Sequence, residues 1–187
     1  MTEQPGSMFQ ELPPLGGEKS DLRIRRGFEG DAESVLTLID DAIAWFVSIG
    51  NVHQWGTAPW SADPVRRARI SAFCAEAGSW IAEDKDGNVL GALVVGGAHD
   101  YVPPMDDELY IRLLIGARSR QARGVGRRLL MVADQQARRL GRGRLRVDCY
   151  AGGSGKLVKF YESCGYRRTE TFSVGTWPGQ LLVRELS

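Results

Sequence analysis

The chain has 187 residues, of which 43% are hydrophobic and 25% are charged, as in an ordinary soluble globular protein with a single core. Its net charge of +1 indicates no class of partner. The three cysteines, an odd number without any Cys-x-x-Cys pair, suggest neither a disulfide framework nor a zinc site. No apolar run approaches the roughly 18 residues of a membrane span, and no signal-peptide pattern is present, so we expect a cytoplasmic protein without bound metal.

The N-terminal 20 residues contain prolines and the glycine-rich stretch "LGGEKS" without hydrophobic periodicity. We therefore expect a flexible tail at 1–20 and a single domain over 21–187. In chain order, the apolar spacing and turn residues predict the following elements: a strand at 21–26, a helix at 31–50, a helix at 64–77, a hairpin of strands at 80–83 and 89–95, a strand at 108–116, a helix at 125–140, a strand at 144–150, a short helix at 156–165, and strands at 166–172 and 180–186.

Two of the predicted helices have clear boundary signals. Asp63 followed by Pro64 is a favoured helix start, since the carboxylate can accept backbone hydrogen bonds and proline suits the first helical position. Gly50 closes the first helix. The order β-α-α-β-β-β-α-β-α-β-β alternates hairpins with helical crossovers, which predicts an α/β protein with a mixed sheet covered by helices.

The stretch "RSRQARGVGRRLL", residues 118–130, follows a predicted strand and runs into the start of a predicted helix. The unpaired N–H groups at a helix start attract anions, and Gly124 and Gly126 would let a phosphate approach the backbone. The dinucleotide pattern G-x-G-x-x-G fails because Leu129 stands at its third glycine, and "YAGGSGKL" fails as a P-loop. The alternatives are a tight turn and a nucleic-acid-binding patch. Against the nucleic-acid-binding patch, no aromatic residue lies among the arginines to stack on bases.

The pattern Gln121-Ala122-Arg123-Gly124-Val125-Gly126 resembles the pyrophosphate loop of the GNAT-type N-acetyltransferases. The later "FYESCGY" is similar to that family's Y-x-x-x-G-F/Y signature, and two helices separate the first two predicted strands. The resemblance implies a GNAT fold, with about seven strands in a mixed, mostly antiparallel sheet flanked by four helices. It also implies transfer of an acetyl group from acetyl-CoA to a primary amine of a small molecule or peptide.

The resemblance assigns residues to the coenzyme. The pantetheine arm would lie along the end of the strand at 108–116, and the pyrophosphate would lie on the loop. Ser154 stands where the family often has asparagine, within a loop that is one residue longer than is usual in the family. The coenzyme-binding residues implied are Leu114, Ile115, Gly116, Gln121, Ala122, Arg123, Gly124, Val125, Gly126, Arg127 and Ser154.

The resemblance also suggests two catalytic residues. Tyr161 occupies the position of the family's tyrosine and could protonate the leaving thiolate, or it could pack between helix and sheet. Asp148 lies near a common position of the base that deprotonates the amine, although it could instead pair with an arginine. Tyr110 stands where some members place a glutamate, so no carboxylate is available there.

The acceptor site is expected around the first two helices, the loop between them and the loop before the last strand. Acidic residues near such an aromatic cleft, namely Asp100, Asp106 and Asp107, would suit a cationic or aromatic amine. The acceptor-binding residues expected are Trp45, His53, Gln54, Trp55, Tyr110 and Trp177. Competing hypotheses are a non-catalytic acyl-CoA sensor on the same fold and a nucleic-acid-binding module, while homodimers are common in the family.

Overall fold

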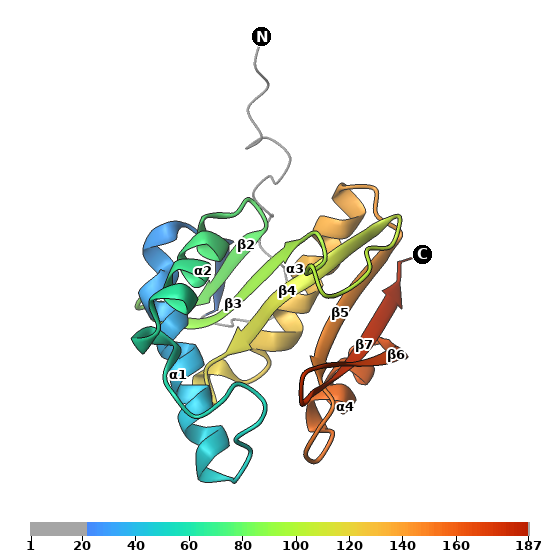
Figure 1. The fold of residues 1–187 in the computed structure, drawn as a ribbon. Helices are drawn as coiled ribbons and strands as arrows, with labels where there is room; N and C mark the ends of the chain where they lie inside the picture. Colours follow the sequence, from blue (N-terminus) through green and yellow to red (C-terminus); the bar gives the residue numbers. More distant parts are fainter. Residues whose placement is uncertain (1–21, 187) are drawn as a thin grey trace.

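The computed structural model describes residues 22–186 (Figure 1). The tail expected at 1–20 lies outside these residues. Three single-turn 3₁₀ helices, which the sequence did not predict, accompany the main elements. The strands are β1 (Arg23–Arg26), β2 (Ser79–Glu83), β3 (Val89–Gly96), β4 (Glu108–Gly116), β5 (Arg144–Tyr150), β6 (Arg167–Val174) and β7 (Trp177–Glu185). The helices are α1 (Ala32–Ser48), α2 (Pro64–Ala75), α3 (Val125–Arg139) and α4 (Lys156–Glu162). The 3₁₀ helices are η2 (Glu29–Asp31), η3 (Trp60–Ala62) and η4 (Arg120–Ala122).

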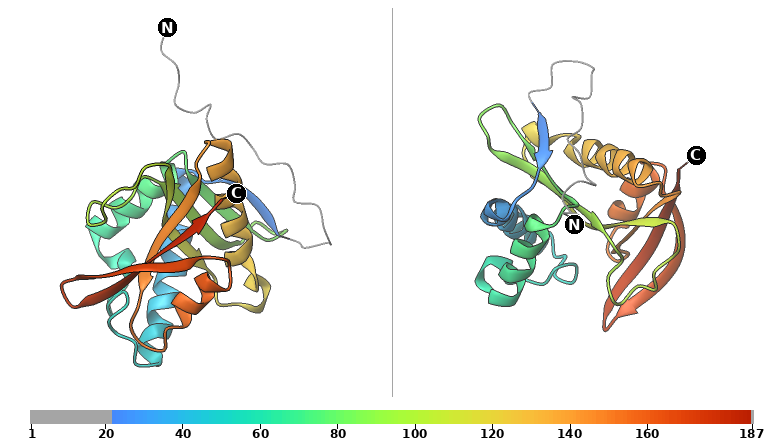
Figure 2. Two further views of the ribbon diagram at one scale, coloured as in Figure 1. Left: turned by 90° about the vertical axis from the view of Figure 1, so that its right-hand side faces the viewer. Right: turned by 90° about the horizontal axis from the view of Figure 1, so that it is seen from above.

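The strands form a seven-stranded sheet in the order β1-β2-β3-β4-β5-β7-β6. Every neighbouring pair is antiparallel except β4 and β5, which are parallel. Helices α1 and α2 cover one face, and α3 and α4 cover the other (Figure 2). The mixed, mostly antiparallel sheet with four helices confirms the predicted fold class.

The local signals place the helices well. The side chain of Asp63 accepts hydrogen bonds from the backbone N–H groups of Val65 and Arg66, at 2.9 and 3.3 Å, and Pro64 is the first residue of α2. Gly50 has φ +78° directly after the end of α1, where glycine adopts the left-handed conformation without strain. None of the helices among residues 22–186 is long and apolar enough to cross a membrane.

The hairpin of β6 and β7 is longer than predicted. Val174 pairs with Trp177 and Ser173 pairs with Pro178, so β7 begins three residues before the expected Gln180. The expected strand began only at 180, after Pro178, and proline lacks the N–H that a ladder needs. Pairing between β5 and β7 ends at Gly179, however, so the proline lies beyond the part of β7 that has strands on both sides.

Strands β4 and β5 pair only at one end. Their register covers four residue pairs, from Glu108 with Arg144 to Ile111 with Val147. Arg112 is an extra residue on β4, since Val94 of β3 pairs with Leu113 and the next residue pairs with Ile111. A bulge of this kind bends its strand. Beyond it the two strands diverge (Figure 1), which leaves the second half of β4 without a partner on the β5 side.

Candidate active site

The diverging strands open a cleft of about 680 Å³. Its walls come from β4, β5 and α4, from α1, α2 and the loop between them, and from the β6–β7 hairpin. Segments far apart in the sequence therefore meet at one site. Nine of the expected site residues line the cleft: His53, Gln54, Trp55, Leu114, Ile115, Gly116, Asp148, Tyr161 and Trp177.

The edge of β4 that faces the cleft carries free backbone groups. Ala117 donates its N–H to the Leu90 carbonyl at 2.8 Å, so Ala117 faces β3. Because backbone groups alternate along a strand, the N–H and C=O of Leu114 and Gly116 point away from β3, into the gap. A Cβ added at Gly116 would meet no atom closer than the Leu90 carbonyl oxygen at 3.9 Å, so the wall is open there.

The loop between β4 and α3 forms a second hollow of about 570 Å³, lined by Ala117, Arg118, Ser119, Arg120, Ala122 and Arg123, just before Gly124. Gly124 precedes α3 with φ +83°, and no side chain caps this helix. The N–H groups of the first helical residues, Val125, Gly126 and Arg127, have no acceptor within the helix. Together with the positive end of the helix dipole, these N–H groups are suited to hydrogen-bond an anion.

Close packing and side-chain orientation shape this loop further. A Cβ at Gly126 would lie 3.2 Å from the ring of Phe160, so glycine lets α3 approach α4. The guanidinium of Arg127 hydrogen-bonds the carbonyl and hydroxyl of Ser163, at 3.0 and 2.8 Å. The side chain of Arg127 is therefore directed to α4, and only its backbone N–H belongs to the loop. Ser154 is exposed and lines neither hollow.

Arg118 connects the two hollows, because it lines both. Its guanidinium carbon lies 3.3 Å from the ring centroid of Trp45, and burial lowers the pKa of this arginine. Trp45 itself does not line the cleft. The structure thus places Trp45 under Arg118 rather than against an acceptor.

Asp148 is held by two tyrosines. Tyr110 donates its hydroxyl to Oδ1 at 2.5 Å, and Tyr101 donates to Oδ2 at 3.3 Å. Burial raises the pKa of both phenols, and the Asp148 carboxylate raises it further, so both remain donors at neutral pH. Among residues 22–186 no arginine forms an ion pair with Asp148, which is contrary to the alternative role considered for it. Tyr110 is completely buried and lies behind Asp148, not in the cleft wall.

Tyr161 reaches the cleft from α4. The residue is 5% exposed, and its ring packs edge-on against Phe160 and Tyr166. Burial raises its pKa well above the ordinary value, so the phenol keeps its proton. Within the described part of the chain the hydroxyl has no hydrogen-bond partner, which leaves it available to a bound molecule.

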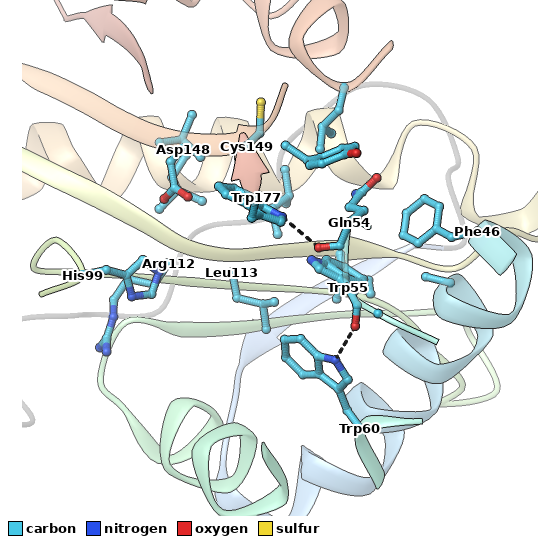
Figure 3. Close-up of a pocket in the computed structure, with 18 of the residues that line it drawn as sticks. Phe46, Gln54, Trp55, Trp60, His99, Arg112, Leu113, Asp148, Cys149 and Trp177 are labelled. Atoms are coloured by element: carbon cyan, nitrogen blue, oxygen red, sulfur yellow. Dashed lines mark hydrogen bonds between the residues drawn. The ribbon is translucent and has the colours of Figure 1, made fainter. Parts of the chain in front are cut away.

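Aromatic residues close the other side of the cleft (Figure 3). The indole N–H of Trp177 donates to the Gln54 carbonyl at 2.9 Å, which ties the loop between α1 and α2 to β7. The indole N–H of Trp60 donates to the Trp55 carbonyl at 3.3 Å, and the two rings lie 5.7 Å apart. These bonds hold the loop in place, while His53 lines the cleft from an exposed position.

Sequence reasoning missed several cleft residues. His99 and Tyr101, just after β3, stack at 5.1 Å and come close to Asp148. Arg69 on α2 also lines the cleft. The stretch "AHDY" and the helical spacing of Arg69 with Phe73 were the available signals, but nothing local shows that they face one cleft.

The charge and the thiol of the cleft wall bear on the chemistry that it can support. Asp100, Asp106 and Asp107, the acids expected near a cationic acceptor, do not line the cleft; the carboxylate among its lining residues is that of Asp148. Cys149 lies in the cleft wall, but burial and the neighbouring Asp148 raise the pKa of its thiol to about 12. Such a thiol is a poor nucleophile at neutral pH. Within residues 22–186 no group of three or more metal-ligating side chains is present.

A family model described as "Acetyltransferase (GNAT) family" matches residues 40–166. The chain is similar to a GCN5-related N-acetyltransferase from Kribbella flavida, at 19% identity and a TM-score of 0.67, covering 90% of this chain and 100% of that one. It is also similar to yncA from Salmonella typhimurium with its cofactor acetyl-CoA, at 17% identity and a TM-score of 0.62, over 89% and 94% of the two chains. An N-acetyltransferase from Staphylococcus aureus Mu50 gives 18% identity, a TM-score of 0.65, and coverage of 89% and 99%.

These structural likenesses, at below 25% identity, show a shared fold. None of the curated protein sequences matches the chain significantly.

Proposed function

Because the chain belongs to the acetyltransferase (GNAT) family, which uses acetyl-CoA, we propose that it transfers the acetyl group to a primary amine of a small molecule or peptide. One observation carries this proposal: the gap between β4 and β5 opens directly onto the uncapped start of α3. An extended pantetheine arm and its pyrophosphate need these two neighbouring features.

The residues present fit the coenzyme. The free N–H and C=O groups of Leu114 and Gly116 can hydrogen-bond an extended arm as an added strand would. The N–H groups at the start of α3 can hold the pyrophosphate, with Arg118 and Arg123 beside the loop. A backbone N–H on the open edge of β4 is also a fixed donor for the oxyanion that develops at the thioester carbonyl.

Asp148 suits the role of base, directly or through a water. A primary amine with a pKa near 10.4 is almost entirely protonated at pH 7, and removing that proton costs about 4–5 kcal/mol. Asp148 offers a carboxylate in the cleft wall, oriented by Tyr110 and Tyr101. Tyr110 and Tyr101 thus act as positioning residues for Asp148.

Tyr161 suits the role of acid. The departing thiolate has the basicity of an ordinary thiol, near 8.5, and benefits from a proton donor. The phenol of Tyr161 keeps its proton and has a free hydroxyl in the cleft. The raised pKa of Cys149 disfavours an acetyl-cysteine intermediate, which supports direct attack by the amine on the thioester.

The test combines binding and turnover. Gly124→Glu places a carboxylate at the phosphate site, and we expect at least a tenfold loss of acetyl-CoA affinity by calorimetry. Gly141→Glu is the matched control, because Gly141 also has a left-handed backbone (φ +65°) and open space, but follows the other end of α3. Equal affinities of Gly124→Glu and the wild type would show that the phosphate site is misplaced.

Release of coenzyme thiol is then measured with a panel of amines. Thiol release that depends on the amine supports catalysis. Binding of acetyl-CoA without release for any amine would favour the non-catalytic acyl-CoA sensor. The carboxylate of Asp148 in the cleft wall weighs against that alternative.

A further inference from the structure

The charged side chains that line the cleft are mostly basic. They are Arg66, Arg69, Arg112, Arg118 and Asp148. One carboxylate therefore faces four guanidinium groups. A site for polyamines or lysine-rich peptides would have the opposite balance, because it must neutralise several positive charges.

Most of these arginines already have partners. Arg112 bonds both carboxylate oxygens of Glu76 at 2.7 Å. Arg66 lies 3.5 Å from the Asp63 carboxylate and over the ring of Trp60. Arg118 stacks on Trp45 beside the phosphate loop, where it serves the coenzyme side of the cleft.

Arg69 is different. Within residues 22–186 it forms no ion pair, and its guanidinium lies 5.9 Å from the ring centroid of Phe73. Residues 66, 69, 70 and 73 recur at helical spacing and all line the cleft, so this face of α2 forms one wall. An exposed arginine on an aromatic surface, without a counter-charge, is well suited to an oxyanion of a ligand.

Arg69, Asp148 and the stacked pair His99 and Tyr101 all line the same cleft. Burial lowers the pKa of His99; the Asp148 carboxylate opposes this effect, whereas the charges of Arg112 and Arg69 add to it. Burial raises the pKa of Tyr101, Asp148 adds to this shift and Arg69 opposes it. Both charges thus act on the same two rings, and Figure 3 shows His99 and Asp148 facing the same space.

On the basis of the proposed acetyl transfer, we propose that the acceptor is an amine that also carries an acidic oxyanion, either a carboxylate or a phosphonate. Arg69 binds the oxyanion through its guanidinium, and the amine lies toward Asp148. Guanidinium groups pair with carboxylates and phosphonates through two parallel hydrogen bonds. The aromatic residues of the cleft hold the apolar part of the acceptor.

The test uses matched acceptors. L-Phenylalanine, L-leucine and L-methionine are each compared with their carboxamides, which keep the amine and side chain but lack the acid. Aminophosphonate analogues distinguish the two kinds of oxyanion, and spermidine represents acceptors without one. We expect kcat/KM for at least one acid to exceed that of its amide by tenfold or more.

The variants locate the effect. Arg69→Gln is expected to lower kcat/KM for the acid 10- to 100-fold, mainly through KM, and to change that of the amide less than twofold. Arg69→Lys should recover part of the loss, since it keeps the charge without the fork geometry. Arg142→Gln is the matched control, because Arg142 is exposed after the end of α3 and lines neither hollow.

Two results would overturn this inference while acetyl transfer stands. One is a preference for amides or spermidine, and the other is an equal effect of Arg69→Gln on acids and amides. If acetyl-CoA binds but no amine releases thiol, the proposed catalysis fails. In that case an NMR titration of the coenzyme-bound protein with N-acetyl-L-phenylalanine decides the oxyanion site. Binding that Arg69→Gln abolishes supports the site, and no binding, or binding that the variant retains, refutes it.

Discussion

Asp148→Asn separates a catalytic base from a structural carboxylate. Asparagine keeps the shape of the side chain and an oxygen that can accept the Tyr110 hydroxyl, now 2.5 Å from Oδ1. It removes the charge and the ability to take a proton. If Asp148 is the catalytic base, the variant should lose much activity. If Asp148 only anchors the tyrosines, the variant should lose mainly some stability.

The two losses can be estimated from the contacts. Replacing a charge-assisted hydrogen bond by a neutral one costs about 1–2 kcal/mol of stability, or a fall in Tm of about 2–8 °C for a chain of this length. General-base catalysis contributes roughly 10²- to 10⁴-fold. We therefore expect kcat/KM at pH 7 to fall by about 100-fold or more, while the protein stays folded.

The pH profile supplies the decisive assay. Without a base, only amine that is already deprotonated reacts, and this fraction rises about tenfold for each pH unit below the amine pKa. The deficit of Asp148→Asn should therefore shrink from pH 7 to pH 9, measured by thiol release at saturating acetyl-CoA. Wild-type activity at pH 7, or a deficit that is constant across this range, would refute the assignment. Tyr110→Phe is the comparison variant, expected to lower activity less because the carboxylate remains.

Three other changes test the site and the fold. Tyr161→Phe should lower kcat about 100-fold while the Kd for acetyl-CoA by calorimetry changes less than twofold; unchanged turnover would reduce Tyr161 to packing. Cys149→Ala should retain turnover, and iodoacetamide at pH 8 should leave Cys149 unlabelled by mass spectrometry, because a thiol pKa of about 12 leaves only about one thiolate in ten thousand. Arg25→Gln should lower the free energy of unfolding in urea by about 3–5 kcal/mol, since Asp31 and Glu83 are buried and both bond Arg25; a loss below 1 kcal/mol would contradict this.

The elements with local signals could be predicted from the sequence. Asp63 with Pro64 marks a helix start by chemistry that needs no tertiary context, and Gly124, with its left-handed backbone, marks the start of α3 in the same local way. The start of β7 was missed because Pro178 normally ends a strand. Whether a proline can be tolerated depends on where the neighbouring strand ends, and only the assembled sheet determines that.

The acceptor half of the cleft could not be predicted in the same way. Tyr101, Tyr110 and Asp148 come from three segments, and their hydrogen bonds depend on how β3, β4 and β5 align. Asp100, Asp106 and Asp107 were expected at the cleft because they are close in sequence to the strand at 108–116. In the structure Asp100 is exposed and outside the cleft, since adjacent residues in a loop can point in opposite directions.

The arginines that follow β4 show why a cluster of basic residues in the sequence carries little information about function. Arg146 is buried, and its guanidinium bonds Glu108 at 3.0 Å and the Pro103 carbonyl at 2.9 Å. Glu108 is the first residue of β4, so this pair braces β4 and β5 at the end where they are hydrogen-bonded. The bulge at Arg112 bends β4 immediately beyond that end. Arg146, which in the sequence is one of several neighbouring arginines, thus helps to hold β4 and β5 together at their paired end. It thereby helps to determine where the cleft begins.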